Sequence, residues 1–364
     1  MTAGQDWTRR GWAASLTAAA IGAAWGKPRR LPSEWARFPD PATEFQLLRL
    51  TNPACSSYLP AYWNRSISRR GEFLLFWSDR TGSPQVFHMS LKNGELQQAA
   101  SMQDLDGASI ALLPDDRGFC CFDGPSLRLV KLSNFKEKEI YRVPEGWRGR
   151  EFSLAPDGSY GLAVEMREGA WRLRMIPIAK GAPSTLLASP DPLALPLASP
   201  AGGAILYRKG NALRWMRAGG ADDRTLALAP GRTGPAFWSP DGSSVLYLNF
   251  PEEKGKLNAI RELNLADGTD RMISVTTQYI HFTPNADASV FAGASGSPAS
   301  PYVLLLLRAT RRELTICEHR AAEPVRVTTV FSPDSQSVLF QSDRHGKLAL
   351  YLASVASLVE RTRL

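Results

Sequence analysis

The sequence is poor in the residues that most often build metal sites and nucleophilic sites. It has four histidines and four cysteines in 364 residues, and no two cysteines have the two-residue spacing of a zinc site. It also lacks the Gly-x-Ser-x-Gly elbow, which argues against a hydrolase with a serine nucleophile. Cys120 and Cys121 are adjacent in a strand-like run, so we expect them to point to opposite faces as small buried hydrophobes.

A strong excess of charge is also missing from most of the chain. The formal net charge is +8, but about half of it comes from residues 1–30, so the remainder is only mildly basic. No basic-aromatic motif accompanies this charge, and we therefore expect no nucleic-acid partner. A mildly basic surface is compatible with an acidic saccharide but does not by itself indicate one.

The chain lacks an apolar run long enough to span a bilayer in the mature protein. Residues 12–25 are apolar but too short for that purpose, and they follow Arg9-Arg10-Gly11-Trp12. Paired arginines with an aromatic two positions later resemble a twin-arginine signal, which exports proteins that are already folded. We therefore expect an export signal at residues 1–26, a linker at residues 27–44 and a periplasmic or exported protein. An ordinary basic tail is the alternative.

What the chain does contain is a repeated turn followed by a β-rich run. In the copy Ser239-Pro240-Asp241-Gly242, proline presets one backbone angle, aspartate can bond its own backbone and glycine tolerates positive φ. Val245 and Tyr247 follow in the alternating pattern of a strand. Proline or its equivalent recurs at positions 69, 114, 156, 200, 240, 286 and 333, in steps of 45, 42, 44, 40, 46 and 47 residues.

Seven copies at this spacing predict the fold. Each step is the length of one four-stranded propeller blade, so we predict an all-β, seven-bladed β-propeller over residues 45–364. A sandwich or a solenoid does not explain seven evenly spaced copies. Residues 45–51 have strand character and precede the first turn, and we expect this N-terminal strand to close the last blade, the one that carries Pro333. Such closure leaves no long open edge.

Three segments, in their order along the chain, resemble the oligogalacturonate lyases, seven-bladed propellers that cleave short pectin fragments. They are residues 50–53 with Cys55, residues 141–147, and residues 331–352 with their Ser-Asp-Arg-His-Gly run. The Ser-Pro-Asp-Gly turn alone is unspecific, because the periplasmic Tol-system propeller shares it. The resemblance implies β-elimination on a uronate, in which a base removes the proton next to a carboxylate. It also implies a divalent metal, typically manganese, held by histidines and a glutamine, with a further histidine as the base.

The repeat brings one residue of each blade to an equivalent place near the channel mouth. Counted six positions before the turn aspartate or its equivalent, these residues are Asn64, Ser109, Glu151, Leu195, Pro235, His281 and Thr328. His281 matches a metal ligand that the resemblance implies, whereas the implied base falls on Pro235, which cannot accept a proton. In the last blade, the implied glutamine and two histidines align with Glu323, Arg326 and Thr328.

These positions define the candidate site residues. His281 and Glu323 are the candidate metal ligands, although two ligands do not make a typical closed site. Arg326, Glu151 and Asn64 are the candidate substrate-binding residues, because a guanidinium pairs bidentately with a carboxylate and needs no metal to do so. No catalytic residue is assigned.

Three functions follow from these observations. The first is an exported, lyase-like propeller that binds an acidic oligosaccharide, with metal-dependent lyase activity lost or altered. The second is an active oligogalacturonide lyase in pectin degradation that uses another base, such as Tyr279 or Glu151. The third is a Tol-like periplasmic scaffold that docks a protein partner. The fold does not choose among them, because propellers host many functions.

Overall fold

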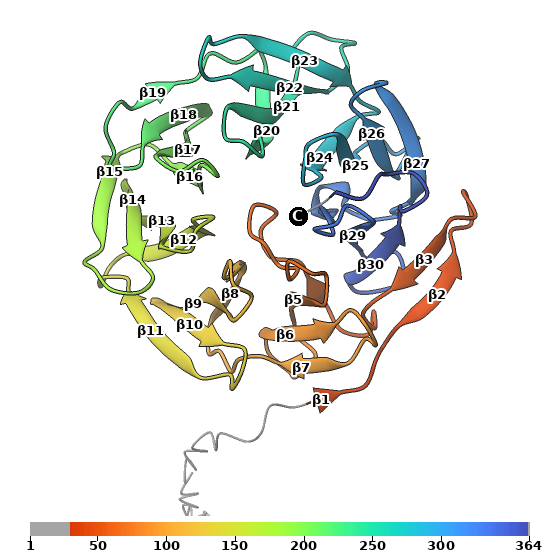
Figure 1. The fold of residues 1–364 in the computed structure, drawn as a ribbon, viewed down its shortest axis with the longest axis horizontal. Helices are drawn as coiled ribbons and strands as arrows, with labels where there is room; N and C mark the ends of the chain where they lie inside the picture. The colour runs from red at the N-terminus through yellow and green to blue at the C-terminus, as the bar shows by residue number, and fades with distance from the viewer. Residues whose placement is uncertain (1–29, 363–364) are drawn as a thin grey trace, which may run out of the picture.

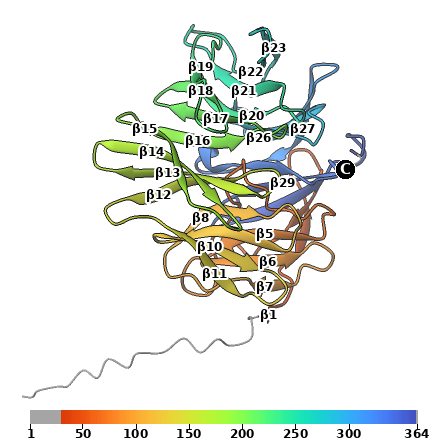
Figure 2. The same cartoon turned by 60° about the vertical axis from the view of Figure 1, so that its left-hand side comes forward.

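The seven predicted blades are present. In the computed structural model, which describes residues 30–362, these residues form seven antiparallel sheets arranged as a ring (Figure 1). Figure 2, turned by 60°, shows the sheets as twisted layers that run from the centre of the ring to its rim. The prediction of an all-β, seven-bladed propeller is therefore confirmed. Among residues 30–362, no helix is long and apolar enough to cross a bilayer.

The first four blades follow one another along the chain, each beginning with the strand nearest the axis. Blade 1 contains β4 (Ser57–Tyr58), β5 (Phe73–Ser78), β6 (Gln85–Ser90), β7 (Leu96–Gln98) and, outermost, β1 (Arg30–Leu31). Blade 2 contains β8 (Leu105–Leu112), β9 (Gly118–Asp123), β10 (Ser126–Lys131) and β11 (Glu137–Arg142). Blade 3 contains β12 (Arg148–Leu154), β13 (Tyr160–Arg167), β14 (Ala170–Pro177) and β15 (Ser184–Ser189). Blade 4 contains β16 (Leu193–Ala198), β17 (Ala204–Lys209), β18 (Ala212–Arg217) and β19 (Arg224–Thr225).

The remaining blades repeat this order, and the last one also receives strands from the N-terminal segment. Blade 5 contains β20 (Arg232–Trp238), β21 (Ser244–Phe250), β22 (Ala259–Asn264) and β23 (Asp270–Val275). Blade 6 contains β24 (Tyr279–Pro284), β25 (Val290–Ser295), β26 (Tyr302–Leu307) and β27 (Arg312–Glu318). Blade 7 follows the 3-10 helix η1 (Pro324–Arg326) and contains β28 (Thr329–Phe331), β29 (Ser337–Ser342), β30 (Ala349–Ser354), β3 (Gln46–Arg49) and β2 (Ala36–Pro39).

Strands from both ends of the described chain share the sheet of blade 7. β3 pairs antiparallel with β30, with Leu47 opposite Ala353, and β2 pairs with β3 on the outer side. At the neighbouring blade, β1 pairs with β7. The interpretation of residues 27–44 as a linker is therefore wrong from Arg30 onward, because this segment adds edge strands to blades 1 and 7.

Two buried arginines fasten this N-terminal segment to the ring. Nη2 of Arg344 lies 3.0 Å from Oδ2 of Asp40, and the two side chains are only 2% and 0% exposed. Nη1 of Arg80 lies 3.0 Å from Oε1 of Glu34. Both arginines occupy the same place in the recurring turns at residues 78–82 and 342–346. The recurrence of Ser-Asp-Arg-x-Gly is thus structural.

The cores lie between neighbouring blades, where the two faces of each sheet meet the next sheet. Cys121 packs in the cluster between blades 1 and 2, and Cys120 packs in the cluster between blades 2 and 3. The prediction that these thiols are buried and point to opposite faces is confirmed. Burial raises the pKa of Cys120 to about 12, so it stays a neutral, unreactive thiol at neutral pH.

We predict that Arg344→Met lowers the free energy of unfolding by about 3–5 kcal/mol, because Asp40 is then left as an unpaired charge in the interior. Urea unfolding followed by tryptophan fluorescence measures this loss. The matched control is Arg361→Met, which removes a pair with Asp334 that is 3.7 Å long and largely exposed. It should cost about 1 kcal/mol or less. Equal losses in the two variants would contradict a stabilising role for the buried pair.

Candidate functional site at the axis

The inner strands of blades 2 to 6 are interrupted at equivalent places. The pairing of each with its neighbour shifts register, and the residues in or beside the shifts are Ser109, Glu151, Leu195, Pro235 and His281. A bulge re-aims a side chain relative to the regular alternation of a strand. The positions that the repeat selects are therefore irregular points of the inner strands. Glu151 and Leu195 also have φ values of 51° and 53°, which are uncommon for residues other than glycine.

A loop from blade 1 reaches to the centre of the ring (Figure 1). This axial loop, residues 59–66, is bonded to blades 2 and 3: Nε1 of Trp63 donates to the carbonyl of Phe152 at 3.1 Å. The side-chain amide of Asn64 donates to the carbonyls of Phe152, at 2.9 Å, and Ala108, at 3.2 Å. The amide group of Asn64, a residue predicted to bind substrate, therefore holds the axial loop in place.

Tyr62 in the same loop contacts the opposite side of the ring. Its ring centroid lies 5.2 Å from that of His281 and 5.0 Å from that of Phe237. Its hydroxyl accepts a hydrogen bond from the backbone N–H of Ala236 at 3.4 Å. Tyr62 thus lies between the two positions where the lyase resemblance would place a base and a metal ligand.

His281 is buried, with 8% of its surface exposed. Its Nδ1 lies 3.4 Å from both the backbone N and the Oγ1 of Thr329. Its Nε2 has no hydrogen-bond partner among residues 30–362. Burial lowers the pKa of His281 to about 3, so the imidazole is neutral at physiological pH.

The other predicted metal ligand does not complete a site with His281. Glu323 is 64% exposed, and its carboxylate lies 3.5 Å from Nε of Arg326. In the part of the chain that the structure describes, no three His, Cys, Asp or Glu side chains come together to hold a metal ion. Pro235 and Leu195 offer no side-chain donor at the neighbouring bulges. The residues present therefore do not fit a manganese centre.

Two charged side chains, Glu151 and Arg208, lie near the axial loop. The Glu151 carboxylate accepts a hydrogen bond from the backbone N–H of Leu195 at 3.1 Å. Arg208 donates to the carbonyls of Thr233 at 3.0 Å and Gly234 at 2.9 Å, which fixes its guanidinium across the bulge of blade 5.

Charged and polar groups from blades 1 to 4 shift one another's pKa values at the axis. Burial raises the pKa of Glu151, and the negative charge of Asp106 raises it further. The hydrogen bond from the Leu195 N–H and the positive charges of Arg150 and Arg208 lower it. Burial likewise raises the pKa of Asp106. Burial lowers the pKa of Arg208, while the nearby Tyr62 opposes that change. We call Tyr62, Asp106, Glu151, Arg208 and His281 the axial cluster.

Two further residues singled out from the sequence lie differently. Arg326 ends η1 and is half exposed, and its backbone carbonyl accepts a hydrogen bond from the Gln341 side chain at 2.7 Å. Its guanidinium is therefore open to a ligand apart from the long contact with Glu323. Tyr279 is fully buried, and its hydroxyl has no access to solvent. Tyr279 is thus unsuited to act as a base.

Sequence reasoning missed three members of the axial cluster. Tyr62 lies in the axial loop, and three aromatic residues within six positions (Tyr58 at the end of β4, with Tyr62 and Trp63 in the loop) were a usable sign of packing. Arg208 carries no motif; it reaches the axis because it pairs with Ala194, next to the bulge at Leu195. Asp106 is the second residue of the inner strand of blade 2, three residues before the position that the repeat selects.

The fold and the axial cluster define a seven-bladed propeller with a charged, partly buried site at its centre. No family model matches the chain. It is 24% identical to the oligogalacturonide lyase of Pectobacterium atrosepticum and to the oligogalacturonate lyase of Dickeya dadantii. In both comparisons the similarity covers 92% of this chain and 99% of the relative.

Solved structures agree with this similarity at the level of the fold. An oligogalacturonate lyase in complex with manganese superposes with a TM-score of 0.84 at 23% identity, over 90% of this chain and 98% of the other. The oligogalacturonate lyase of Vibrio parahaemolyticus superposes with a TM-score of 0.83 at 19% identity, over 91% and 99%. The resemblance to oligogalacturonate lyases is confirmed over nearly the whole chain.

We predict that Glu151→Gln stabilises the protein more at pH 8 than at pH 4. Because the pKa of Glu151 is raised in the folded state, the folded protein binds this proton more tightly than the unfolded chain. Stability is therefore lost as pH rises through the folded-state pKa, and removal of the charge restores it only above that range. Glutamine can still accept the hydrogen bond from Leu195. Urea unfolding at the two pH values measures the difference.

The control is Glu145→Gln, a change at an exposed carboxylate, which should shift stability equally at both pH values. A pH-independent effect of Glu151→Gln would show that its carboxylate is not buried as described.

Proposed function

We propose that the protein binds acidic oligosaccharides of the uronate type near the axis, without metal-dependent cleavage. The observation that carries this proposal is the similarity to oligogalacturonate lyases over 92% of the chain, combined with a residue set that does not fit their metal. The relatives' names supply the proposed substrate class. The axial residues are the reason to propose that binding takes place without metal-dependent cleavage.

Two arginines support recognition of a uronate. Arg326 presents a half-exposed guanidinium at the end of η1, and Arg208 presents a partly buried one beside Glu151. A guanidinium binds a carboxylate through two parallel hydrogen bonds, and such charge-assisted bonds are stronger than neutral ones. Arg326 is the exposed point of first contact, whereas Arg208 lies deeper in the ring.

The same residues support the proposal that β-elimination does not take place at this site. Removal of the proton at carbon 5 requires an accessible base and a positive group on the adjacent carboxylate. The implied base position is Pro235, and His281 is buried beneath Tyr62. Of the two alternative bases named from the sequence, Tyr279 and Glu151, only Glu151 remains, and an active lyase would operate through it.

We predict that Arg326→Ala lowers the affinity for trigalacturonate by about 10-fold or more, since it removes a charge-assisted contact. Isothermal titration calorimetry at low salt measures the affinity. Arg361→Ala is the matched control, because Arg361 pairs with Asp334 in the turn that follows β28, whereas Arg326 lies ahead of that strand, and the change should leave binding unchanged. Unchanged affinity in Arg326→Ala would reject the role of this arginine.

We also propose that the protein is exported by the twin-arginine route. The residues that support this lie outside the described part of the chain, so the proposal rests on Arg9-Arg10-Gly11-Trp12 and the apolar run that follows. Replacing both arginines by lysine should keep the protein in the cytoplasm, as measured by cell fractionation. Export that continues in this variant would rule out the route.

A further inference from the structure

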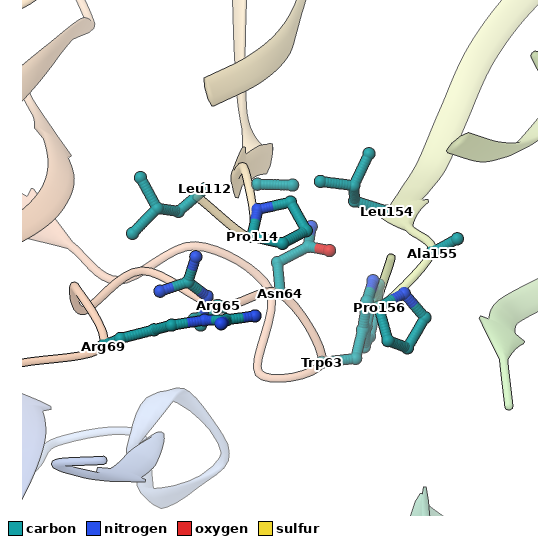
Figure 3. Close-up of a pocket in the computed structure, with 10 residues that line it drawn as sticks. Trp63, Asn64, Arg65, Arg69, Leu112, Pro114, Leu154, Ala155 and Pro156 are labelled. Atoms are coloured by element: carbon teal, nitrogen blue, oxygen red, sulfur yellow. The ribbon is translucent and has the colours of Figure 1, made fainter. Parts of the chain in front are cut away.

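A cavity of about 280 Å³ lies beside the axial loop at the ends of two inner strands. It is bordered by the turns that follow β8 and β12, whereas the predicted site residues lie earlier along those strands. Trp63, Asn64, Arg65 and Arg69 line one part of it, and Pro114 and Pro156 line the other (Figure 3). The proposed function does not use this cavity.

One cation that lines the cavity, the exposed side chain of Arg69, has no acidic partner in the described chain. Arg65 pairs with Asp116 and donates to the carbonyl of Ile67 at 3.2 Å. The backbone N–H of Arg69 also bonds Asp116, at 2.8 Å. The guanidinium of Arg69, in contrast, has no hydrogen-bond or ion-pair partner within residues 30–362. Asp116 therefore compensates Arg65 and leaves Arg69 available to an anion.

Arg69 is also a departure from the repeat. It stands in the turn Ser68-Arg69-Arg70-Gly71, where the best copies of the repeat have proline and aspartate. At this turn the two arginines replace a rigid residue and an acidic one. Within the described residues, no acidic side chain pairs with the guanidinium of either arginine, so no ion pair explains the two basic residues at this turn.

The aromatic side of the cavity is rigidly held. Nε1 of Trp63 is bonded to the carbonyl of Phe152, which fixes the orientation of the indole. In Figure 3 the indole is seen nearly edge-on, with Pro156 beside one face and the other face toward Arg65 and Arg69. An aromatic face opposite a guanidinium matches a ligand with one apolar face and one carboxylate.

We propose that this cavity binds a single uronate ring, with its carboxylate on Arg69 and its C–H face on Trp63. Ligand pockets span about 300–1,000 Å³, so a cavity of about 280 Å³, just below this range, has room for about one sugar ring. The site goes beyond the proposed function, because it is separate from Arg326 and the axial cluster. The choice of a uronate as the ligand rests on the proposed function.

The test is a calorimetric titration of monomeric galacturonate, compared among the whole protein and two variants. We expect Arg69→Ala to weaken binding by about 10-fold or more and Arg70→Ala, a change at the adjacent arginine outside the cavity lining, to change it less than 2-fold. Galactose, which lacks the carboxylate, should not bind. Equal affinity in the two variants, or no binding of galacturonate to the unaltered protein, would overturn the proposal.

Two further titrations separate this site from the proposed one. Arg326→Ala should leave galacturonate binding unchanged while it weakens trigalacturonate binding, and Arg69→Ala should do the reverse. If trigalacturonate binds and galacturonate does not, the cavity proposal fails and the proposed function stands. If inorganic phosphate competes fully with galacturonate and binds Arg69 as tightly, the cavity is an unspecific anion site and the uronate assignment is wrong. Matching urea unfolding curves would show that Arg69→Ala folds normally.

Discussion

The ring depends on the contact between Asp40 and Arg344, two side chains that are almost completely buried and far apart in the sequence. This ion pair, together with the pairing of β3 and β30, ties the N-terminal segment to the last blade. A buried charge is stable only when it is paired, so the contact strongly penalises an open ring. Each of the seven blades brings its inner strand to one axis only when the ring is closed. The geometry of the axial cluster is therefore a consequence of closure.

The inner-strand bulges explain how one fold changes its chemistry without changing its shape. In blades 2 to 6 the same irregularity lies at the same place, but the residue there is serine, glutamate, leucine, proline or histidine. Backbone geometry thus sets where a side chain stands, and residue type alone sets what it does. Arg208, which bonds the carbonyls of Thr233 and Gly234 beside Pro235, and Tyr62, which packs against His281, bring a cation and an aromatic ring close to the places where the lyase resemblance implies a base and a metal ligand.

The sequence predicted those parts of the fold that a repeated local pattern marks, such as the turn of each blade. It did not predict contacts between segments that are far apart along the chain. Seven turn copies were enough to predict seven blades, and the alternation of a strand was enough to place Cys120 and Cys121 on opposite faces. The docking of residues 30–44 was missed, because the segment looks like a linker and its partners, Arg80 and Arg344, are revealed only by the fold. The contact of Tyr62 with His281 could not be predicted either, since it depends on a loop of blade 1 that reaches the centre of the ring.

We propose that this lyase-like propeller recognises a uronate with arginine in place of a metal. The most direct measurement is a parallel titration of trigalacturonate into the metal-stripped protein with a chelator and into the same protein with manganese, while the absorbance of the unsaturated product is recorded. We expect the same affinity in both titrations and no rise in absorbance. Binding that requires manganese, or an absorbance rise that depends on it, would show that a working metal centre exists and would contradict the claim.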